Sequence, residues 1–290
     1  MVFGVDDMPA SADKYRATSF SSVGGGPAAT AAVAISKLGG RASLVSRIGD
    51  DHIGTIIIAE LEQLGVDCSL IQRFSGSQSS LSVVLVDKAG ERLIVNYLDA
   101  DLPSDTACLP ENLPASVSVV LADTRWPDGA AKVLLQGKRA GLSAVLDADV
   151  PVPADGELLR AATHIAFSAA GLADFTSDPD PRTGLLSVAE SFDAWCCVTI
   201  GAEGTLYLDG NEIRCIPAFK VPVRDTLGAG DTWHGAFALA LAEGRDEIQA
   251  VIFATAAAAL KVQSPGGRTG VPERQEVEVF LRDYVTGDSD

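Results

Sequence analysis

The sequence predicts an α/β protein in which a mostly parallel central sheet is covered by helices on both faces. Apolar strand-like runs alternate with helical segments between residues 117 and 200, and this alternation is typical of parallel sheets. The chain has 290 residues, of which 47% are hydrophobic, so it can bury a core of ordinary size for one domain. Charged residues make up only 21%, which excludes a largely disordered chain.

The balance of charge and the cysteines limit the partners. A formal net charge of −17 repels phosphate backbones and anionic lipids, so neither nucleic acid nor a membrane is an expected partner. No apolar segment reaches the roughly 18 residues of a membrane span, and no signal peptide precedes the first acidic residues, which favours the cytoplasm. The five cysteines lack CxxC spacing and indicate free thiols rather than zinc, with Cys196 and Cys197 inside a buried strand.

The first third of the chain predicts one helix pair and several strands. Gly24-Gly25-Gly26-Pro27 precedes an alanine-rich helix that ends near Leu38. A strand is expected over 42–46, a helix over 53–64 and two paired strands over 80–86 and 92–98. Strand pieces drawn from about 10–23 and 79–98 do not fit the β–α alternation. They predict a small sheet that acts as a lid over the strand ends of a single domain spanning 1–290.

The remaining two thirds follow the alternation closely. The expected strands and helices, in chain order, are a strand over 117–121, a helix over 129–139, strands over 144–146, 164–167 and 194–200, a hairpin over 205–208 and 213–216, and helices over 232–242, 246–263 and 274–284.

The most informative segment is Asp225-Thr226-Leu227-Gly228-Ala229-Gly230-Asp231, which runs directly into a helix. The N–H groups of Gly228, Ala229 and Gly230 would point outward at the positive end of the helix dipole, which suits an anion. Asp231 would lie at the same place, ready to accept a proton from a hydroxyl. From this local pattern alone, a simple helix cap at Asp231 is an equal alternative.

This segment resembles the DTxGAGD signature of the ribokinase-like (PfkB) family of carbohydrate kinases. Three further segments match in the family's order: Gly25-Gly26, Ile48-Gly49-Asp50-Asp51, and Val198-Thr199-Ile200-Gly201 with Gly204. The resemblance covers nearly the whole chain. It implies a three-layer sandwich with a small β-sheet lid, and ATP-dependent transfer of a phosphoryl group to a sugar.

The resemblance also implies roles for individual positions. Asp231 corresponds to the catalytic base, and Gly228, Ala229 and Gly230 to the anion hole for the γ-phosphate of ATP. The other implied positions are Gly25 and Gly26 at the substrate side, Thr199, Gly201, Gly204, Gly228 and Gly230 at the nucleotide, and Asp225 and Thr226, with the loop 264–267, at a monovalent cation such as K⁺. Mg²⁺ is implied together with ATP.

Three features depart from the family pattern. Ser168-Ala169-Ala170-Gly171 replaces the NxxE motif, so Mg²⁺ would be held differently, through water and Asp147 or Asp149, for which solvated strand ends are an equal alternative. Thr30 stands where many members carry an asparagine that faces the substrate. The chain opens past the position of the family's buried first strand, and we expect a central sheet without this strand to be poorly stable.

Within the family, several segments are similar to sulfofructose kinases, which implies 6-deoxy-6-sulfofructose as the ketose phosphorylated at a primary hydroxyl. Lys14, Asn96 and Arg125 match the residues that hold the sulfonate, and their charges and amide suit such an anion. A phosphorylated ketose would use the same charges. The alternatives are a fructokinase, ribokinase or nucleoside kinase, or a catalytically silent protein that binds sugar or nucleotide. We expect a homodimer through the lid, and His234 as a packed helix position.

Overall fold

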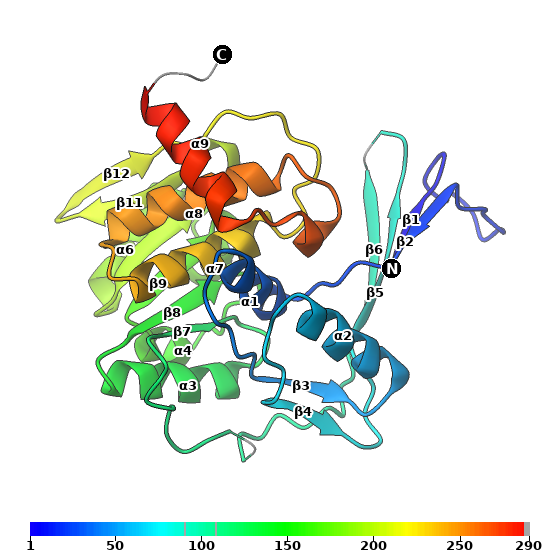
Figure 1. Cartoon of the computed structure of the whole chain (residues 1–290), viewed down its shortest axis with the longest axis horizontal. Coiled ribbons are helices and arrows are strands. Elements are labelled where there is room, and N and C mark those ends of the chain that lie inside the picture. The colour runs from blue at the N-terminus through cyan, green and yellow to red at the C-terminus, as the bar shows by residue number, and fades with distance from the viewer. Residues whose placement is uncertain (90, 108, 287–290) are drawn as a thin grey trace.

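A six-stranded sheet forms the centre of the computed structural model, which describes residues 1–89, 91–107 and 109–286 (Figure 1). The strand order is β12-β11-β10-β9-β8-β7, in which β7 to β10 are parallel and β11 and β12 are antiparallel. The strands are β7 (Val119–Ala122), β8 (Ser143–Ala148), β9 (His164–Ser168), β10 (Trp195–Thr199), β11 (Thr205–Asp209) and β12 (Glu212–Ile216). The prediction of a mostly parallel sheet is confirmed.

Helices cover both faces of this sheet. One face carries α3 (Pro127–Arg139), α4 (Glu157–Ala161), α5 (Ala169–Thr176) and α6 (Pro181–Ser191). The other carries α1 (Pro27–Lys37), α7 (Ala229–Ala242), α8 (Glu247–Lys261) and α9 (Arg274–Thr286). Successive residues of β10 divide between the two cores, Cys196 on the first side and Cys197 on the second, as the period of a strand requires. Both cysteines are buried, as predicted.

Two smaller sheets lie outside the central one. The small sheet has the order β2-β1-β5-β6 and projects at the right of Figure 1; its strands are β1 (Val2–Gly4), β2 (Ser19–Ser21), β5 (Leu81–Val86) and β6 (Arg92–Tyr97). A parallel pair, β3 (Ser46–Gly49) and β4 (Ile71–Phe74), packs with α2 (His52–Gln63). Sequence analysis missed β1 and β4 and placed β3 too early, since three or four residues carry little periodicity.

The central sheet ends at β7, and the β3–β4 pair is separate from it. Among the described residues, the first strand of the chain therefore belongs to the small sheet, where β1 runs parallel to β5.

The cysteines that the structure describes, Cys68, Cys196, Cys197 and Cys215, are free thiols, while Cys108 lies outside the described residues. Within the described ranges, no helix combines the length and the apolar character needed to cross a bilayer.

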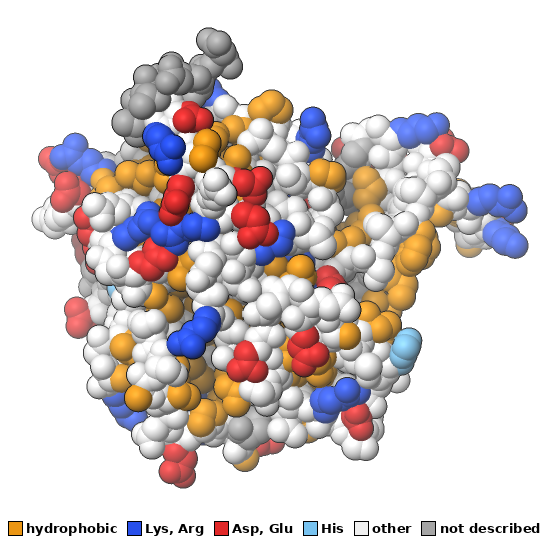
Figure 2. Space-filling model, in the orientation of Figure 1, with side chains coloured by type: hydrophobic (Ala, Val, Ile, Leu, Met, Phe, Trp, Pro, Cys, Tyr) orange, Lys and Arg blue, Asp and Glu red, His pale blue; other side chains and the backbone are white. Residues whose placement is uncertain are grey.

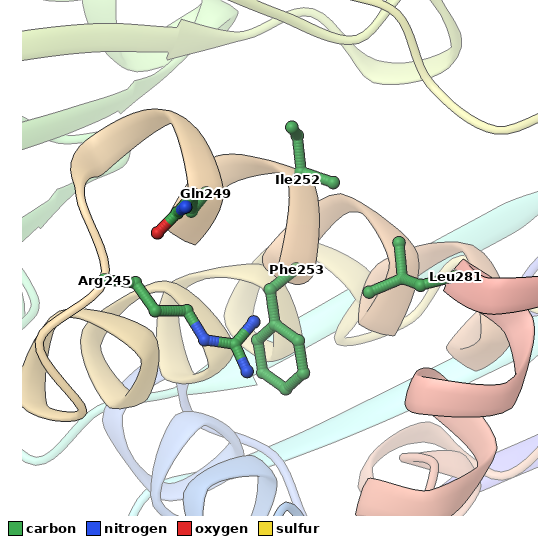
Figure 3. Close-up of a pocket in the computed structure, with 5 residues that line it drawn as sticks. All are labelled: Arg245, Gln249, Ile252, Phe253 and Leu281. Atoms are coloured by element: carbon green, nitrogen blue, oxygen red, sulfur yellow. The ribbon is translucent and has the colours of Figure 1, made fainter. Parts of the chain in front are cut away.

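A shallow hollow on the surface lies between α8 and α9. Figure 3 shows the guanidinium of Arg245 over the ring of Phe253, at 4.5 Å from the ring centroid. Gln249, Ile252 and Leu281 complete the lining. The Arg245 guanidinium thus forms a cation–π stack that covers the Phe253 ring.

The helices α1 and α7 pack closely against each other at Gly235. A Cβ at Gly235 of α7 would lie 2.5 Å from the carbonyl oxygen of Ala31 and 3.0 Å from the Cβ of Ala34. The absence of a side chain at Gly235 therefore lets the two backbones approach closely, and small residues on α1 do the same from the other side. This contact sets the distance between the start of α1 and the start of α7.

We predict that Gly235→Ala destabilises the protein although alanine favours helices. The added methyl group meets backbone that cannot move independently, and overpacking of this kind costs about 1–3 kcal/mol. Urea unfolding measures the difference. Gly184→Ala in α6 is the matched control, because the nearest atoms to its methyl group belong to side chains, Leu172 at 3.1 Å and Thr176 Oγ1 at 3.3 Å, and not to backbone. Equal or higher stability of Gly235→Ala would contradict the close contact.

Candidate active site

The carboxyl ends of the parallel strands bring several polar residues to one edge of the sheet. Asp123 follows β7, Asp149 follows β8, Ser168 ends β9 and Thr199 ends β10. Open α/β sheets bind ligands at this edge. Four segments that are distant in the sequence therefore meet there, because their strands run in the same direction.

Ser168 is the first residue of the segment that stands in place of the NxxE motif, and its hydroxyl makes two hydrogen bonds at the sheet edge. Its hydroxyl donates to Asp149 Oδ1 at 2.6 Å and accepts from the N–H of Gly171 at 2.9 Å. Ser168 is thus the N-cap of α5, and it holds the Asp149 carboxylate at the sheet edge. Asp149 Oδ2 also lies 3.5 Å from Arg125 Nη2.

The turn before α7 faces the same edge. Gly228 adopts a φ of 77°, a left-handed conformation that favours glycine, and α7 begins at the next residue. Gly230 is exposed, and nothing lies within 4 Å of the position of a Cβ there. The N–H of Ala229 donates to the carbonyl of Thr226 at 3.2 Å. Of the three predicted anion-hole donors, Ala229 is therefore already engaged within the turn.

Asp231 lies in the first turn of α7 and is half-buried. Burial raises its pKa to about 6, with the negative charge of Asp147 adding to the effect, while His234 and a hydrogen bond from Thr30 oppose it. A carboxylate with this pKa is a stronger base than an exposed aspartate and is still ionised at neutral pH. The carboxyl group therefore suits proton abstraction.

Thr30 connects the first glycine motif to this turn. It is buried on α1, its hydroxyl is hydrogen-bonded to Asp231, and its Cγ2 lies 3.2 Å from the position of a Cβ on Gly228. Gly26 is the N-cap of α1, with a φ of 92°. Asp123 accepts a hydrogen bond from the N–H of Ala28 at 3.0 Å. The start of α1 is thereby fixed to the sheet edge and to the base.

His234 and Asp147 form a buried pair beneath the base. His234 Nε2 is 3.4 Å from Asp147 Oδ1 and 3.2 Å from the carbonyl oxygen of Ala166, and Nδ1 is 2.9 Å from the carbonyl oxygen of Gly230. Burial, with the charges of Asp123 and Asp149, raises the pKa of Asp147, and burial lowers the pKa of His234. Both groups are thus driven toward their neutral forms.

The geometry favours Asp149 over Asp147 as a carboxylate for Mg²⁺. Asp147 is 4% exposed and faces His234, whereas Asp149 is half exposed at the strand end. Among the described residues, no group of three or more histidine, cysteine or acidic side chains forms a ready metal site. Any Mg²⁺ here would need ligands from the nucleotide or from water.

The expected nucleotide residues form the turn between β10 and β11. Thr199 donates to the carbonyl of Phe167 at 3.3 Å and lies opposite Ser168 in the sheet. Gly201 has a φ of 61° and begins a 3₁₀ turn (η1, Gly201–Glu203). Gly204 has a φ of 112°, and a Cβ there would be 2.1 Å from the carbonyl oxygen of Ile216. This turn therefore lies beside the strand ends that carry Ser168 and Asp149.

The three predicted anion-binding side chains come from separate segments and have different partners. Asn96 on β6 donates to Ser82 at 2.8 Å, and Arg125 pairs with Asp149 at 3.5 Å. Lys14 is exposed in the segment between β1 and β2, which projects away from the helices in Figure 1. The charge of Arg125 is thus already partly offset by a neighbouring carboxylate.

Sequence and structural comparisons identify the class of protein that this fold and site define. Residues 2–274 match the model of the pfkB family of carbohydrate kinases. A ribokinase from Bacillus subtilis is 30% identical over 283 residues, which are 97% of this chain and 95% of that protein. A ribokinase from Haemophilus influenzae is 29% identical and covers 89% of this chain and 87% of its own.

Similar solved structures agree with this family match. A crystal structure described as a candidate ribokinase from Agrobacterium tumefaciens has a TM-score of 0.91 and 37% identity, and covers 98% of this chain and 94% of its own. Ribokinase from Thermotoga maritima has a TM-score of 0.83 and 27% identity, with coverage of 97% and 95%. The chain belongs to the pfkB family of carbohydrate kinases. It is an ATP-dependent phosphotransferase that acts on a sugar hydroxyl, as predicted.

We predict that Asp231→Asn makes the protein more stable at about pH 8 by on the order of 1–3 kcal/mol. The folded-state pKa of Asp231, about 6, is above that of an unfolded aspartate, so its stabilising effect in acid is lost as the pH rises through 6. The amide does not ionise and avoids this loss. Urea unfolding at about pH 4 and about pH 8 measures the gain. A gain of equal size at both pH values would contradict the raised pKa.

Proposed function

We propose that this chain transfers the γ-phosphoryl group of ATP to a primary hydroxyl of a sugar, with Asp231 as the catalytic base. The single observation that carries the proposal is the position of Asp231: it lies half-buried in the first turn of α7, three residues after the N-cap Gly228, where burial raises its pKa. An aspartate that only caps a helix is not expected to have a raised pKa, because the helix dipole stabilises the charged form of a capping carboxylate. The local environment of Asp231 thus favours catalysis over capping.

In the proposed reaction, Asp231 accepts the proton of the sugar hydroxyl while the hydroxyl oxygen forms a bond to the γ-phosphorus. The bond from that phosphorus to the β–γ bridging oxygen breaks, and ADP leaves. Negative charge on the transferred group faces the open turn at Gly228 and Gly230, where the N-terminus of α7 stabilises it. Thr30 holds the Asp231 carboxylate by its hydroxyl and is a positioning residue.

The turn of Thr199, Gly201 and Gly204 is the proposed contact of the nucleotide, because it lies beside the strand ends that carry Asp149. When bound, Mg²⁺ would neutralise phosphate charge, and Asp149 is the carboxylate we assign to it, directly or through water. Asp147 is left out of this role because its carboxyl group faces His234.

We propose that the small sheet is the lid of the sugar site and that it also joins two copies of the chain. Apolar side chains are exposed on it, as the right side of Figure 2 shows, and they include Phe20, Ile94, Val95, Tyr97 and Leu98. Among the residues that the structure describes, β6 is the end strand of this sheet, next to β5 alone. An exposed apolar edge strand favours pairing with another chain.

Two sugars have specific support. The match of Lys14, Asn96 and Arg125 to a sulfonate-binding set supports 6-deoxy-6-sulfofructose. The likeness to ribokinases from two bacteria supports ribose. The pairing of Arg125 with Asp149 leaves less positive charge for a sulfonate, so ribose is an equal candidate for the substrate.

We predict Mg-ATP-dependent turnover of one of these sugars, and a loss of roughly 10²–10⁴-fold in kcat for Asp231→Asn. The assay compares ribose, fructose, fructose 6-phosphate and 6-deoxy-6-sulfofructose. If the sulfosugar is preferred, Lys14→Ala and Arg125→Ala should remove that preference and leave neutral sugars unaffected. Full activity of Asp231→Asn would exclude the base, and binding of sugar without turnover would favour a silent binding protein.

We predict that Thr30→Val moves the acidic limb of the kcat/KM profile of the kinase toward higher pH. The Thr30 hydroxyl stabilises the Asp231 carboxylate, so its removal raises the pKa of the base above its value of about 6. At high pH the rate should change by less than about tenfold, since the base is then ionised in both proteins. An unchanged midpoint would show that Thr30 does not act on Asp231.

A further inference from the structure

A fully buried lysine contacts the loop that leads into α7. Lys261 is the last residue of α8 and is 0% exposed. Its ammonium donates to the carbonyl oxygen of Asp225 at 2.9 Å and lies 3.3 Å from Asp225 Oδ2. A lysine is almost never fully buried unless its charge is paired, so this position has a specific role.

The Asp225 carboxylate also accepts hydrogen bonds from the surrounding loops. Asp225 Oδ2 accepts from the N–H groups of Gly266 and Gly267 at 3.1 and 3.0 Å, and Oδ1 accepts from the N–H of Leu227 at 2.9 Å. Burial alone would raise the pKa of Asp225, but the hydrogen bonds from Gly267 and Leu227 and the charge of Lys261 hold it below its usual value. The ammonium and the carboxylate thus join α8, the loop that precedes Gly228 and the turn at 266–267.

This arrangement does not fit the monovalent cation that the family resemblance implies at Asp225 and Thr226. A cation such as K⁺ binds where carbonyl and carboxylate oxygens replace its water shell. The backbone and carboxylate oxygens of Asp225 that would do so already face the ammonium of Lys261. A second cation against the same oxygens would meet the like charge of Lys261 at close range.

We propose that the Lys261 ammonium is a built-in monovalent cation for the Asp225 loop, so that this kinase works without K⁺. The inference rests on the proposed function of Asp231 and its turn. Lys261 touches neither sugar nor nucleotide and is a positioning residue. It fixes Asp225, which begins the loop that leads through Gly228 into α7, and thereby the donors that face the phosphate.

The first measurement uses the wild-type protein. Its melting temperature without nucleotide and its kinase activity are compared in potassium chloride and in tetramethylammonium chloride at equal ionic strength. We expect the two salts to give the same melting temperature and rates that agree within about twofold, since equal ionic strength screens charges equally. A melting temperature or a rate that rises selectively with K⁺ would overturn the proposal.

The second measurement restores the cation from solution. Lys261→Ala removes the ammonium and leaves space, and we expect a loss of roughly 10–100-fold in kcat that K⁺ or NH₄⁺ partly restores. The melting temperature of this variant should rise with the same ions. Lys261→Met fills the space without charge and should not recover. A loss that no cation restores in Lys261→Ala, or recovery of Lys261→Met, would contradict the role as a cation.

Lys138→Ala is the matched control. The Lys138 ammonium likewise donates to backbone, to the carbonyl oxygens of Arg160 and Ala162, but it lies on α3 and neither of these contacts involves Asp225. We expect no rescue by K⁺ in this variant. If none of the tested sugars is phosphorylated, the proposed function fails, while the melting temperatures still test the cation. If Lys261→Ala does not fold, the comparison of the two salts with the wild-type protein decides whether the kinase works without K⁺.

Discussion

The close approach of α1 and α7 at Gly235 is the constraint on which the site depends. Gly235 leaves no side chain between α7 and the Ala31 carbonyl of α1, so Thr30 reaches Asp231 and Gly228 from one side. On the other side, His234 contacts the Ala166 carbonyl in β9 and Asp147 in β8. The first turn of α7 is therefore held between a helix and the strand ends, and the direction of the Asp231 carboxyl follows from that packing.

Two buried cations extend this arrangement to the loops. Lys261 holds the loop before Gly228 through Asp225, as described above. Arg268, 1% exposed, contacts Glu60 Oε1 and Oε2 at 3.0 Å and the carbonyl oxygen of Gly25 at 3.4 Å. A Cβ on Gly24 would overlap the Arg268 guanidinium, at 1.8 Å from Nη2, which explains a glycine there. The segment 264–268 thus links the first glycine motif to the phosphate turn in a protein that is strongly acidic overall.

The sequence predicted the parts of the site that are contiguous in the chain. The strands, the helices and the segment from Asp225 to Asp231 were located because periodicity and glycine spacing are local signals. The pair of His234 and Asp147 and the pair of Lys261 and Asp225 could not be found in this way. Their members are far apart in sequence, and the distance between them is set by the packing of α7 and α8 on the sheet.

Residue type also misleads in particular cases. From sequence, a lysine at the end of a helix, such as Lys261, is usually predicted to be an exposed cation that interacts with the helix dipole. His234 was expected to be a packed helix position; it is buried, but it also contacts Asp147 and the backbone around the base. Asp123 has no predicted role, and its contact with the N–H of Ala28 depends on where β7 ends.

The buried pair beneath Asp231 has a consequence for how the site titrates. Asp147, His234 and Asp231 lie close enough to influence each other's pKa, so protons leave the cluster in steps that belong to the group rather than to one residue. Burial and the charges of Asp123 and Asp149 favour an uncharged Asp147, and ionisation of one carboxyl group raises the cost of ionising the next. Because burial opposes charge on both Asp147 and His234, negative charge in the cluster is favoured on Asp231, the member that is half-buried at the turn. The buried pair thus favours a single accessible base at the turn, while the carboxylates at the strand ends are held by other partners, Asp149 by Ser168 and Arg125 and Asp123 by the N–H of Ala28.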